Sequence, residues 1–390
     1  MKFLCKTSDL LHALTLVSRA ISTQQALPIL GNILFQAEGR RCTVSATDLE
    51  FSIVTSLDAH IENEGSVTVP ARAILNFAQY NSDTEVLIET IEGTQLRCVS
   101  DHAKTTIAGE SATEYPAIPP IKKQTVFTLD GRSLFEALQL TTFTCARSTL
   151  RPVLSGVYLC AEKGELALVG TDSYRLSESK ISIKGGDTSF SCIVPMKVLD
   201  ELKGILSRQR GEEGTENKGK KEKVDIAETP SVSTAEIILS DQQIRIAIGN
   251  TQLFSRLIEG KFPDYHQIVP QKETTRALIP TRELVTSIKR MHYFAKEMNN
   301  NLTFTMKEGG VRVTTPQTQA GKDEAEIPAD ITGAGNKIAL SSAYILDFLA
   351  HVDEDTVDMR VIDSMHPAVF RLLRSPHFLH LVMPLRLQEE

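Results

Sequence analysis

The sequence lacks the features of a membrane-embedded or secreted protein. No stretch reaches the roughly 18 consecutive apolar residues that a membrane-spanning helix needs. Charged residues appear within the first ten positions, at Lys2, Lys6 and Asp9, which is unlike a secretory signal. We therefore expect a cytoplasmic protein with no membrane partner.

Cysteine is scarce and poorly placed for a disulfide framework or a metal site. Six cysteines are spread from Cys5 to Cys192, no two of them form a Cys-x-x-Cys pair, and none follows position 192. This distribution favours buried free thiols in a reducing compartment over disulfides or metal ligands.

The common catalytic motifs are also absent. The chain contains no Gly-x-x-x-x-Gly-Lys-Ser/Thr, no His-Glu-x-x-His and no Gly-x-Ser-x-Gly. His377 and His380 fall in an alternating stretch, where we expect surface positions on a strand, and we expect no acidic partner for His366. The sequence therefore predicts no catalytic residue, cofactor or metal.

Length and net charge bound the remaining possibilities. At 390 residues, with roughly 100–150 residues per domain, about three domains are expected. The formal net charge of −7 argues against a protein that coats nucleic acid with its whole surface. It leaves room for a local basic strip on an otherwise acidic body.

A threefold repeat is the strongest positive signal in the sequence. Apolar residues fall three, four and seven positions after each of three anchors, Thr7, Gly131 and Thr281. This spacing predicts three amphipathic helices with one buried stripe each, opened by a small or hydroxyl residue that can cap the helix.

A second set of anchors shows the same apolar spacing. These anchors are Pro70, Pro195 and Ser342, and they follow the first set after 63, 64 and 61 residues. Proline in a first turn and serine near an N-cap both favour a helix start. Between the paired helices the period changes to alternating, β-rich stretches with Gly, Asn and Asp turns. Each third of the chain therefore predicts an α+β unit of two helices backed by antiparallel sheets.

The repeat sets the expected domain boundaries, with domains at 1–121, 122–257 and 258–390. Residues 211–234 fall outside the repeat, because they are rich in Lys and Glu with almost no large apolar side chain. We expect a flexible charged loop there. A functional basic arm is the less favoured alternative, because acidic residues interleave with the lysines.

Two aspartates recur at equivalent places in the first two repeats. Asp48 follows Thr47, and Asp172 follows Thr171. A paired-carboxylate site would need the two aspartates a few ångströms apart, whereas a repeat places them in separate domains. We therefore expect each aspartate to cap the backbone of its own turn.

Basic residues on and beside the predicted helices are the remaining functional signal. Arg72, Lys197 and Arg282 are among them, and acidic residues on the same helices dilute their charge. Taken alone, this pattern is more typical of a solvated helix face than of phosphate binding.

Six short motifs punctuate the three repeats. They are Leu27-Pro-Ile-Leu-Gly-Asn, Ala46-Thr-Asp-Leu-Glu, Thr68-Val-Pro-Ala-Arg, Gly170-Thr-Asp-Ser-Tyr-Arg-Leu, Leu257-Ile-Glu-Gly-Lys-Phe-Pro-Asp-Tyr and Val382-Met-Pro-Leu-Arg-Leu. In this order and spacing they resemble the bacterial DNA sliding clamps, the β subunits of the replicative DNA polymerase holoenzyme. The resemblance runs from Met1 to Leu387 and is broken only by the charged segment.

This resemblance implies a DNA polymerase processivity factor with no catalytic residue of its own. It implies the DNA clamp fold and a head-to-tail homodimer, in which helices line the hole of a ring and sheets form its outer wall. Such a ring encircles duplex DNA without regard to sequence, so its contacts with DNA can be few and salt-sensitive. The implied partners are duplex DNA, the polymerase catalytic subunit, the clamp loader, and repair and translesion polymerases.

The resemblance also implies a pocket between the second and third repeats that binds a short, apolar-ended peptide from these partners. Carried over by motif, its residues are Leu154, Thr171, Ser173, Tyr174, Arg175, Leu176, Pro263, Gln267, Ile268, Met365, Pro367, Leu381, Val382, Met383, Pro384, Leu385, Arg386 and Leu387. Leu, Ile, Met and Pro walls with a few polar groups suit a groove that accepts an apolar anchor. Without the resemblance, Met383-Pro-Leu would be interpreted as an ordinary C-terminal strand.

Two further sets of residues follow from the resemblance. The implied DNA contacts are Gln24, Arg72, Ser148, Arg151, Lys197 and Arg282. The implied dimer seam places Tyr293 and Phe294 near Ile107 of the other subunit. The chain departs from the family at Gln24, where relatives often carry a basic residue, and in the segment 148–153, which lacks the tyrosines of some relatives. It also adds Gln388-Glu-Glu after the last motif.

Two other functions compete with a clamp. A three-domain enzyme with a cleft between the second and third repeats would need a convergent acid, base or metal set, and the sequence offers none. A monomeric peptide-binding scaffold would never enclose DNA. It would have the mass of one chain, 43.0 kDa, rather than that of a dimer.

Overall fold

The computed structural model describes residues 1–22, 27–118, 120–122, 124–148, 150–184, 189–216 and 234–387, with the backbone alone over 208–216. The chain divides into two compact units. Unit 1 contains Met1–Gly131 and Gly204–Leu257, and unit 2 contains Arg132–Lys203 and Ile258–Glu390. No helix in the described part of the chain is long and apolar enough to cross a membrane.

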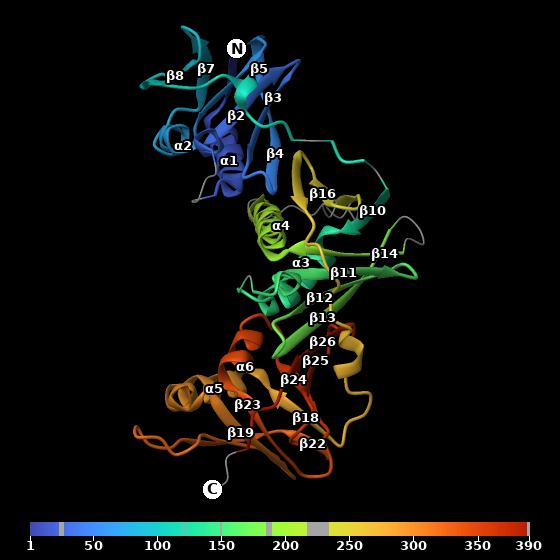
Figure 1. Cartoon of the computed structure of the whole chain (residues 1–390). Helices are drawn as coiled ribbons and strands as arrows, with labels where there is room; N and C mark the ends of the chain where they lie inside the picture. The colour runs from blue at the N-terminus through green and yellow to red at the C-terminus, as the bar shows by residue number, and fades with distance from the viewer. Residues whose placement is uncertain are drawn as a thin grey trace, which may run out of the picture. The chain divides into compact units, whose positions relative to one another are not determined.

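All six predicted helices are present, each beginning at its anchor or one residue after it (Figure 1). They are α1 (Thr7–Val17), α2 (Ala71–Gln79), α3 (Gly131–Thr141), α4 (Met196–Glu216), α5 (Thr281–Ala295) and α6 (Ser342–Leu349). The helix α4 continues six residues into the segment expected to be a loop from 211. Residues 217–233, the rest of that charged segment, lie outside the described residues.

The helices begin without the side-chain caps that the sequence predicts. In α1, α2 and α5 the N-cap residues are Lys6, Pro70 and Pro280, which have no side-chain oxygen to accept a capping bond, and the N-cap Ser341 of α6 makes none either. A neighbouring backbone carbonyl takes the place of the cap. The Thr7 amide donates to Thr84 O (3.0 Å), and the equivalent Thr281 amide donates to Asp355 O (2.8 Å).

Unit 1 contains two antiparallel sheets. The five-stranded sheet, in the order β5-β1-β7-β8-β9, has β1 (Lys2–Lys6), β5 (His60–Asn63), β7 (Glu85–Ile91), β8 (Gln95–Val99) and β9 (Lys104–Ile107). The eight-stranded sheet, in the order β10-β15-β16-β17-β4-β3-β2-β6, has β2 (Asn32–Glu38), β3 (Arg41–Thr47), β4 (Phe51–Asp58), β6 (Gly65–Pro70), β10 (Thr125–Asp130), β15 (Thr234–Leu239), β16 (Gln243–Ile248) and β17 (Thr251–Arg256).

Unit 2 also contains two antiparallel sheets. The nine-stranded sheet, in the order β14-β11-β12-β13-β26-β25-β24-β18-β22, has β11 (Gly156–Glu162), β12 (Glu165–Thr171), β13 (Arg175–Ser182), β14 (Phe190–Pro195), β18 (Thr275–Pro280), β22 (Asp330–Gly333), β24 (Thr356–Val361), β25 (Ala368–Leu372) and β26 (Phe378–Val382). The four-stranded sheet, in the order β21-β20-β19-β23, has β19 (Asn301–Lys307), β20 (Gly310–Thr314), β21 (Glu324–Pro328) and β23 (Asn336–Ser341).

The topology repeats three times, and neighbouring repeats share a sheet. Each repeat contributes one half-sheet that contains the strand before its first helix and one half-sheet between its two helices. The half-sheet of β2, β3, β4 and β6 joins that of the second repeat where β4 pairs with β17. The next junction has the same form, because β13 pairs with β26. At both junctions the third of the strands between the two helices of one repeat pairs with the last strand of the following repeat.

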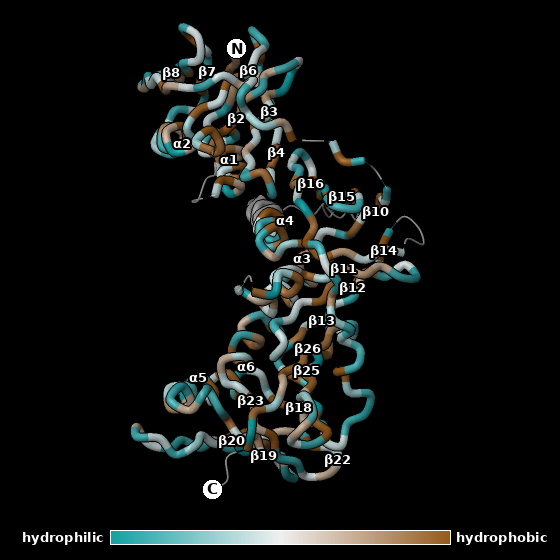
Figure 2. The backbone as a smooth tube through the Cα atoms, in the orientation of Figure 1, coloured by the Kyte–Doolittle hydropathy of each residue, from teal (hydrophilic) through white to brown (hydrophobic). Residues whose placement is uncertain are grey.

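Each unit buries its helices' apolar stripes against strands. In unit 2, α5 and α6 pack through Leu284, Ile288 and Phe348 onto a core that includes Phe304 and Phe370, all five essentially inaccessible to solvent. Figure 2 shows the apolar positions concentrated along the helices and strands and the hydrophilic ones at the loops. The predicted α+β fold is therefore confirmed, with one stripe per helix facing the sheets.

The prediction for His380 is wrong, because this residue is completely buried. Its strand β26 lies between β13 and β25 and is covered on both faces, so alternation along it does not mark a surface. The imidazole stacks on Phe348, with ring centroids 4.5 Å apart, and its Nδ1 lies 2.8 Å from the Ser177 hydroxyl. His377 precedes the strand and is exposed, as expected.

Two smaller expectations also need correction. His366 does have an acidic partner, because its Nδ1 lies 2.8 Å from Asp363 in the turn that follows β24. All six cysteines are free, as expected, but Cys160 and Cys192 are only partly buried. Both of them lie on the two outermost strands at one end of the nine-stranded sheet, β11 and β14, where fewer neighbours cover them.

The burial of His380 predicts a pH dependence of stability. Desolvation, with Arg175 and His351 nearby, lowers the pKa of His380 to about 3 from 6.5. Between these two values the unfolded chain binds a proton at this position and the folded chain does not, so stability falls as the pH drops below 6.5. We expect about 1.4 kcal/mol lost per pH unit from this group.

Urea unfolding of the unmodified chain and of His380→Asn, at about pH 7 and about pH 5.5, measures this contribution. The variant should lose less stability on acidification, and His377→Asn, at an exposed position, should behave like the unmodified chain. Equal losses in all three proteins would contradict the assignment.

Candidate partner-binding site

A tight turn at residues 171–175 forms one wall of the candidate site. Asp172 caps it as predicted, because its Oδ1 accepts hydrogen bonds from the amides of Tyr174 (2.9 Å) and Arg175 (3.1 Å). The Thr171 hydroxyl accepts from the Ser173 amide and donates to the Arg175 carbonyl. These bonds hold Ser173 at a φ of 80°, a left-handed conformation that its surroundings must impose on a non-glycine residue.

The first repeat contains the same turn, but without an arginine at its last position. Asp48 Oδ1 accepts from the amides of Glu50 (3.2 Å) and Phe51 (2.7 Å), and Leu49 adopts a φ of 78°. Each aspartate therefore caps its own backbone, as predicted. The buried Phe51 occupies the place that Arg175 takes in the second repeat, so only the turn at 171–175 presents a guanidinium.

Arg175 is held in place on several sides. Its Nε donates to Asp172 Oδ2 (3.1 Å), its Nη1 to Asp347 Oδ2 (2.5 Å) and its Nη2 to the Phe143 carbonyl (3.0 Å). The guanidinium carbon lies 4.8 Å from the centre of the Tyr344 ring. With a side chain only 10% exposed, Arg175 is a fixed part of the wall rather than a mobile surface arginine.

The predicted pocket residues divide into a buried floor and an accessible rim. Leu154, Leu176 and Leu381 are buried in one apolar cluster, to which Phe262 and Tyr265 also belong. Thr171, Pro367 and Val382 are also buried. The exposed members are Ser173, Tyr174 (62% exposed), Pro263, Gln267, Ile268 (43%), Met365 (82%) and Arg386, and the partly buried ones are Arg175, Met383, Pro384, Leu385 and Leu387.

The final segment is fixed on both of its edges. Arg175 lies opposite Val382 in the β13–β26 ladder, and the Met383 amide donates to Tyr174 O (2.9 Å). Two residues later, the Leu385 amide donates to Ala339 O on β23 (2.8 Å). Since successive residues of an extended chain point to opposite sides, these bonds determine how Met383 and Leu385 are presented.

Helix α6 contributes residues to this wall that the motifs did not predict. Tyr344 stacks on Tyr174, with ring centroids 6.3 Å apart, and Asp347 binds Arg175. Tyr344 stands two positions after Ser342, outside the stripe at offsets three, four and seven. A large aromatic residue at that polar position was the one sequence signal that could have revealed it.

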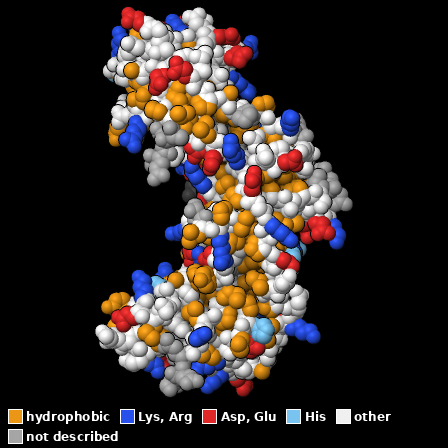
Figure 3. Space-filling model, viewed as in Figure 1, with side chains coloured by type: hydrophobic (Ala, Val, Ile, Leu, Met, Phe, Trp, Pro, Cys, Tyr) orange, Lys and Arg blue, Asp and Glu red, His pale blue; other side chains and the backbone are white. Residues whose placement is uncertain are grey.

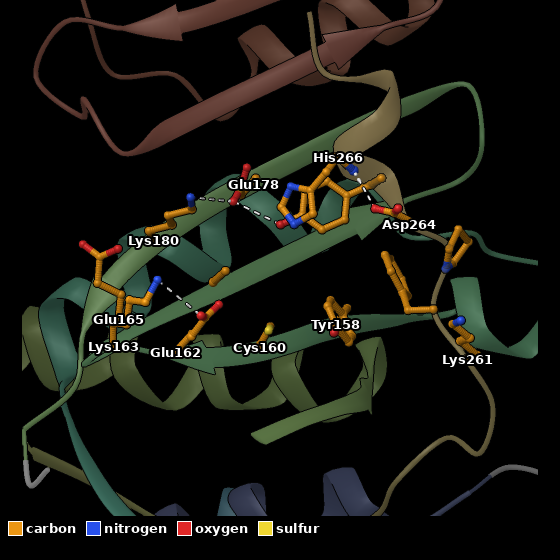
Figure 4. A pocket seen from close by; sticks show the side chains of 14 residues that line it. Tyr158, Cys160, Glu162, Lys163, Glu165, Glu178, Lys180, Lys261, Asp264 and His266 are labelled. Atoms are coloured by element: carbon orange, nitrogen blue, oxygen red, sulfur yellow. Dashed lines mark hydrogen bonds and ion pairs between the residues drawn. The ribbon is translucent and has the colours of Figure 1, made fainter. Parts of the chain in front are cut away.

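A pocket of about 370 Å³ lies on the face of strands β11, β12 and β13 (Figure 4). The segment that contains Phe262 and His266 covers one side, and Tyr158 stacks on Phe262 with ring centroids 4.7 Å apart. The buried Glu178 accepts from the Tyr265 hydroxyl (3.1 Å) and pairs with Lys180 (3.2 Å). The buried carboxylate of Glu178 in this pocket is therefore already paired within the chain.

Neither surface has the chemistry of an active site. No group of three or more His, Cys, Asp or Glu side chains suitable for a metal ion occurs among the described residues. Burial raises the pKa of Cys145 and of Cys192 to about 12, so these thiols are not ionised near neutrality. The turn at 171–175 and the buried leucines beneath it combine a polar wall with an apolar floor, which suits binding of a peptide.

The candidate DNA contacts include the starts of several helices. Arg72, Lys197 and Arg282 are each the second residue of a helix, α2, α4 and α5, and each side chain is exposed. Ser148 and Arg151 lie in the exposed loop after α3, and Gln24 lies outside the described residues. A cation at a helix N-terminus opposes the helix dipole, so helix stability does not explain this placement.

Basic side chains do not form one continuous block on the visible surface. On the face shown in Figure 3, Lys and Arg are scattered among acidic and neutral side chains. This agrees with the acidic net charge and with the exclusion of a protein that coats nucleic acid over its whole surface.

Models of one protein family cover most of the chain. The N-terminal domain of the DNA polymerase III beta subunit matches residues 1–119, the central domain 128–214 and the C-terminal domain 266–386. The chain belongs to the DNA polymerase III β-subunit family. As members of this family are non-catalytic processivity subunits, the expectation of a clamp is confirmed and the enzyme alternative is set aside.

Full-length relatives agree with this membership. Proteins named beta sliding clamp from Synechocystis sp. and Staphylococcus aureus are each 26% identical and cover 99% of this chain, with 100% and 99% of their own lengths aligned. A solved DNA polymerase sliding clamp from Bacillus subtilis is 25% identical, with a TM-score of 0.88 and complete coverage of both chains.

The residues expected at the seam of a β-subunit dimer lie on different units. Tyr293 (70% exposed) and Phe294 pack edge to face near the end of α5, a helix that also contacts β21. Ile107 lies at the end of β9 and is already buried within its own chain. Any contact that Ile107 makes with a second chain therefore involves the backbone of its strand.

Proposed function

We propose that two copies of this chain close head to tail into a ring around duplex DNA and tether the replicative polymerase in the cytoplasm. The main support for this proposal is the topology of the sheets. At both junctions within the chain, the third of the strands between the helices of one repeat pairs with the last strand of the next, as β4 does with β17 and β13 with β26. We take the three repeats as domains 1–121, 122–257 and 258–390.

The same rule specifies how one copy meets the next. In the third repeat the strand equivalent to β4 and β13 is β21, and in the first repeat the strand equivalent to β17 and β26 is β9. Both lie at the edge of their sheets, where an unpaired ladder favours addition of another strand. Pairing β21 with β9 of a second copy continues the pattern, and doing so twice closes a ring.

Charge on the two edges supports this pairing. The exposed Lys104 lies on β9, whereas Glu324 and Glu326 lie exposed on β21, where the two carboxylates share Arg312 of β20 as a partner. Opposite charges across a strand pair are favourable, and like charges would oppose it. Tyr293 and Phe294 lie near the end of α5, the helix that contacts β21, and would provide apolar contact area at the same seam.

A closed ring explains how an acidic protein serves DNA. A closed ring stays on DNA because it encloses the duplex, so its contacts with DNA can be weak enough to permit sliding. We assign these contacts to Arg72, Ser148, Arg151, Lys197 and Arg282, with Gln24 as a further candidate. Cations beside helix N-termini suit phosphate groups, because the amides and the dipole at a helix start also attract anions.

The groove behind the turn at 171–175 is the proposed site for partner peptides. Its buried leucine floor and the rim of Tyr174, Ile268, Met365 and Met383 suit the apolar end of a short peptide. The clamp loader, the polymerase catalytic subunit, and repair and translesion polymerases would compete for it. Because partners would be recruited through this groove, the ring itself would not need to recognise a DNA sequence.

Retention on DNA of different topology tests the ring directly. After loading by the clamp loader, we expect the protein to remain on circular duplex DNA during gel filtration and to be lost from the same DNA after a single linearising cut. Raising the salt should release little from the circle, because the link is topological. Equal retention on the two forms would refute topological tethering.

The groove has a separate test. Met383→Ala combined with Leu385→Ala removes apolar rim area, so we expect loss of binding to a short apolar-ended partner peptide and loss of polymerase stimulation. Fluorescence anisotropy measures the first effect and primer extension the second. The dimer should persist, and Leu373→Ala, an exposed leucine outside the groove, should have no effect. A variant that retained full peptide affinity would remove these residues from the site.

A further inference from the structure

We infer that Asp347 is the positioning residue that fixes Arg175 as the polar wall of the peptide groove. The inference rests on the proposed function of that groove and adds a residue on α6 that none of the sequence motifs includes. Its basis is the ion pair between Arg175 Nη1 and Asp347 Oδ2, which joins the second repeat to the third within unit 2.

The local turn alone does not determine the direction of the guanidinium. Asp172 engages the Nε edge, but Asp172 belongs to the same turn as Arg175 and moves with it. Arg175 Nη2 donates to the Phe143 carbonyl, and Nη1 donates to Asp347 on α6. Asp347 is thus the one charged partner of Arg175 that a different repeat supplies among the described residues, and it sets the guanidinium relative to α6.

The turn of α6 that carries Asp347 is itself packed against the second repeat. The backbone carbonyl of Asp347 lies 2.8 Å from His351 Nδ1, and the His351 ring stacks on Phe143 with centroids 4.3 Å apart and 9° between the planes. The Tyr344 ring, one helical turn earlier, covers the guanidinium face and also stacks on Tyr174. One face of α6 therefore holds Arg175 by charge at one position and by an aromatic face at another.

The exposed fractions of the Asp347 and Arg175 side chains indicate that the ion pair matters more for the orientation of Arg175 than for the stability of the fold. The Asp347 side chain is 38% exposed, so solvent screens the pair and its loss should cost the fold little. Arg175 is 10% exposed and each of its three nitrogens already donates within the chain, so its orientation determines the shape and charge of the wall that a peptide would meet. Removing Asp347 should therefore change the groove far more than it changes the stability of the chain.

Asp347→Asn tests this assignment in the full-length dimer, because asparagine keeps the side-chain volume and removes the charge. We expect the same fluorescent apolar-ended peptide to bind about five- to tenfold more weakly, with the unfolding midpoint nearly unchanged. Asp353→Asn, an exposed acid just after the same helix, is the matched control and should bind as the unmodified chain does.

A double-mutant cycle shows whether Asp347 acts through Arg175. In an Arg175→Ala background, Asp347→Asn should weaken peptide binding no further. Equal losses in both backgrounds, or full affinity in the single variant while the unmodified chain binds, would overturn the positioning role alone. Failure of the unmodified chain to bind the peptide would instead overturn the proposed groove and this inference with it.

Discussion

Pairing of strands across the boundary between repeats is the constraint on which the rest of this molecule depends. An edge strand carries a row of unpaired amides and carbonyls, and a sheet is most stable when that row finds a partner. Within the chain this happens twice, at β4–β17 and at β13–β26. The remaining equivalents, β9 and β21, are left at sheet edges because the chain has three repeats and no fourth.

The proposed peptide groove is a consequence of the same pairing. The β13–β26 ladder brings the turn at 171–175 beside the final segment, and the bond from the Met383 amide to Tyr174 O closes the corner. Buried leucines from both repeats then form a shared floor. The equivalent turn at 47–51 has the same backbone but carries Phe51 in place of Arg175, so repetition of the fold does not repeat the polar wall.

The sequence predicted the repeated elements well because periodicity is local: all six helices begin at or beside their anchors. It failed where a tertiary neighbour decides the outcome. The alternation around His380 could not reveal that β26 is covered on both faces. The hydroxyl caps expected at Thr7 and Thr281 are replaced by carbonyls from distant residues. The groove residues on α6 were missed because Tyr344 meets Arg175 only after folding.

The mass of the particle in solution is the most direct test of edge pairing between copies. Sedimentation equilibrium at neutral pH and moderate salt should give about 86 kDa, twice the 43.0 kDa of one chain, over a wide range of concentrations. A particle of single-chain mass at micromolar concentration would contradict the account, because β9 and β21 would then remain unpaired and no ring could close.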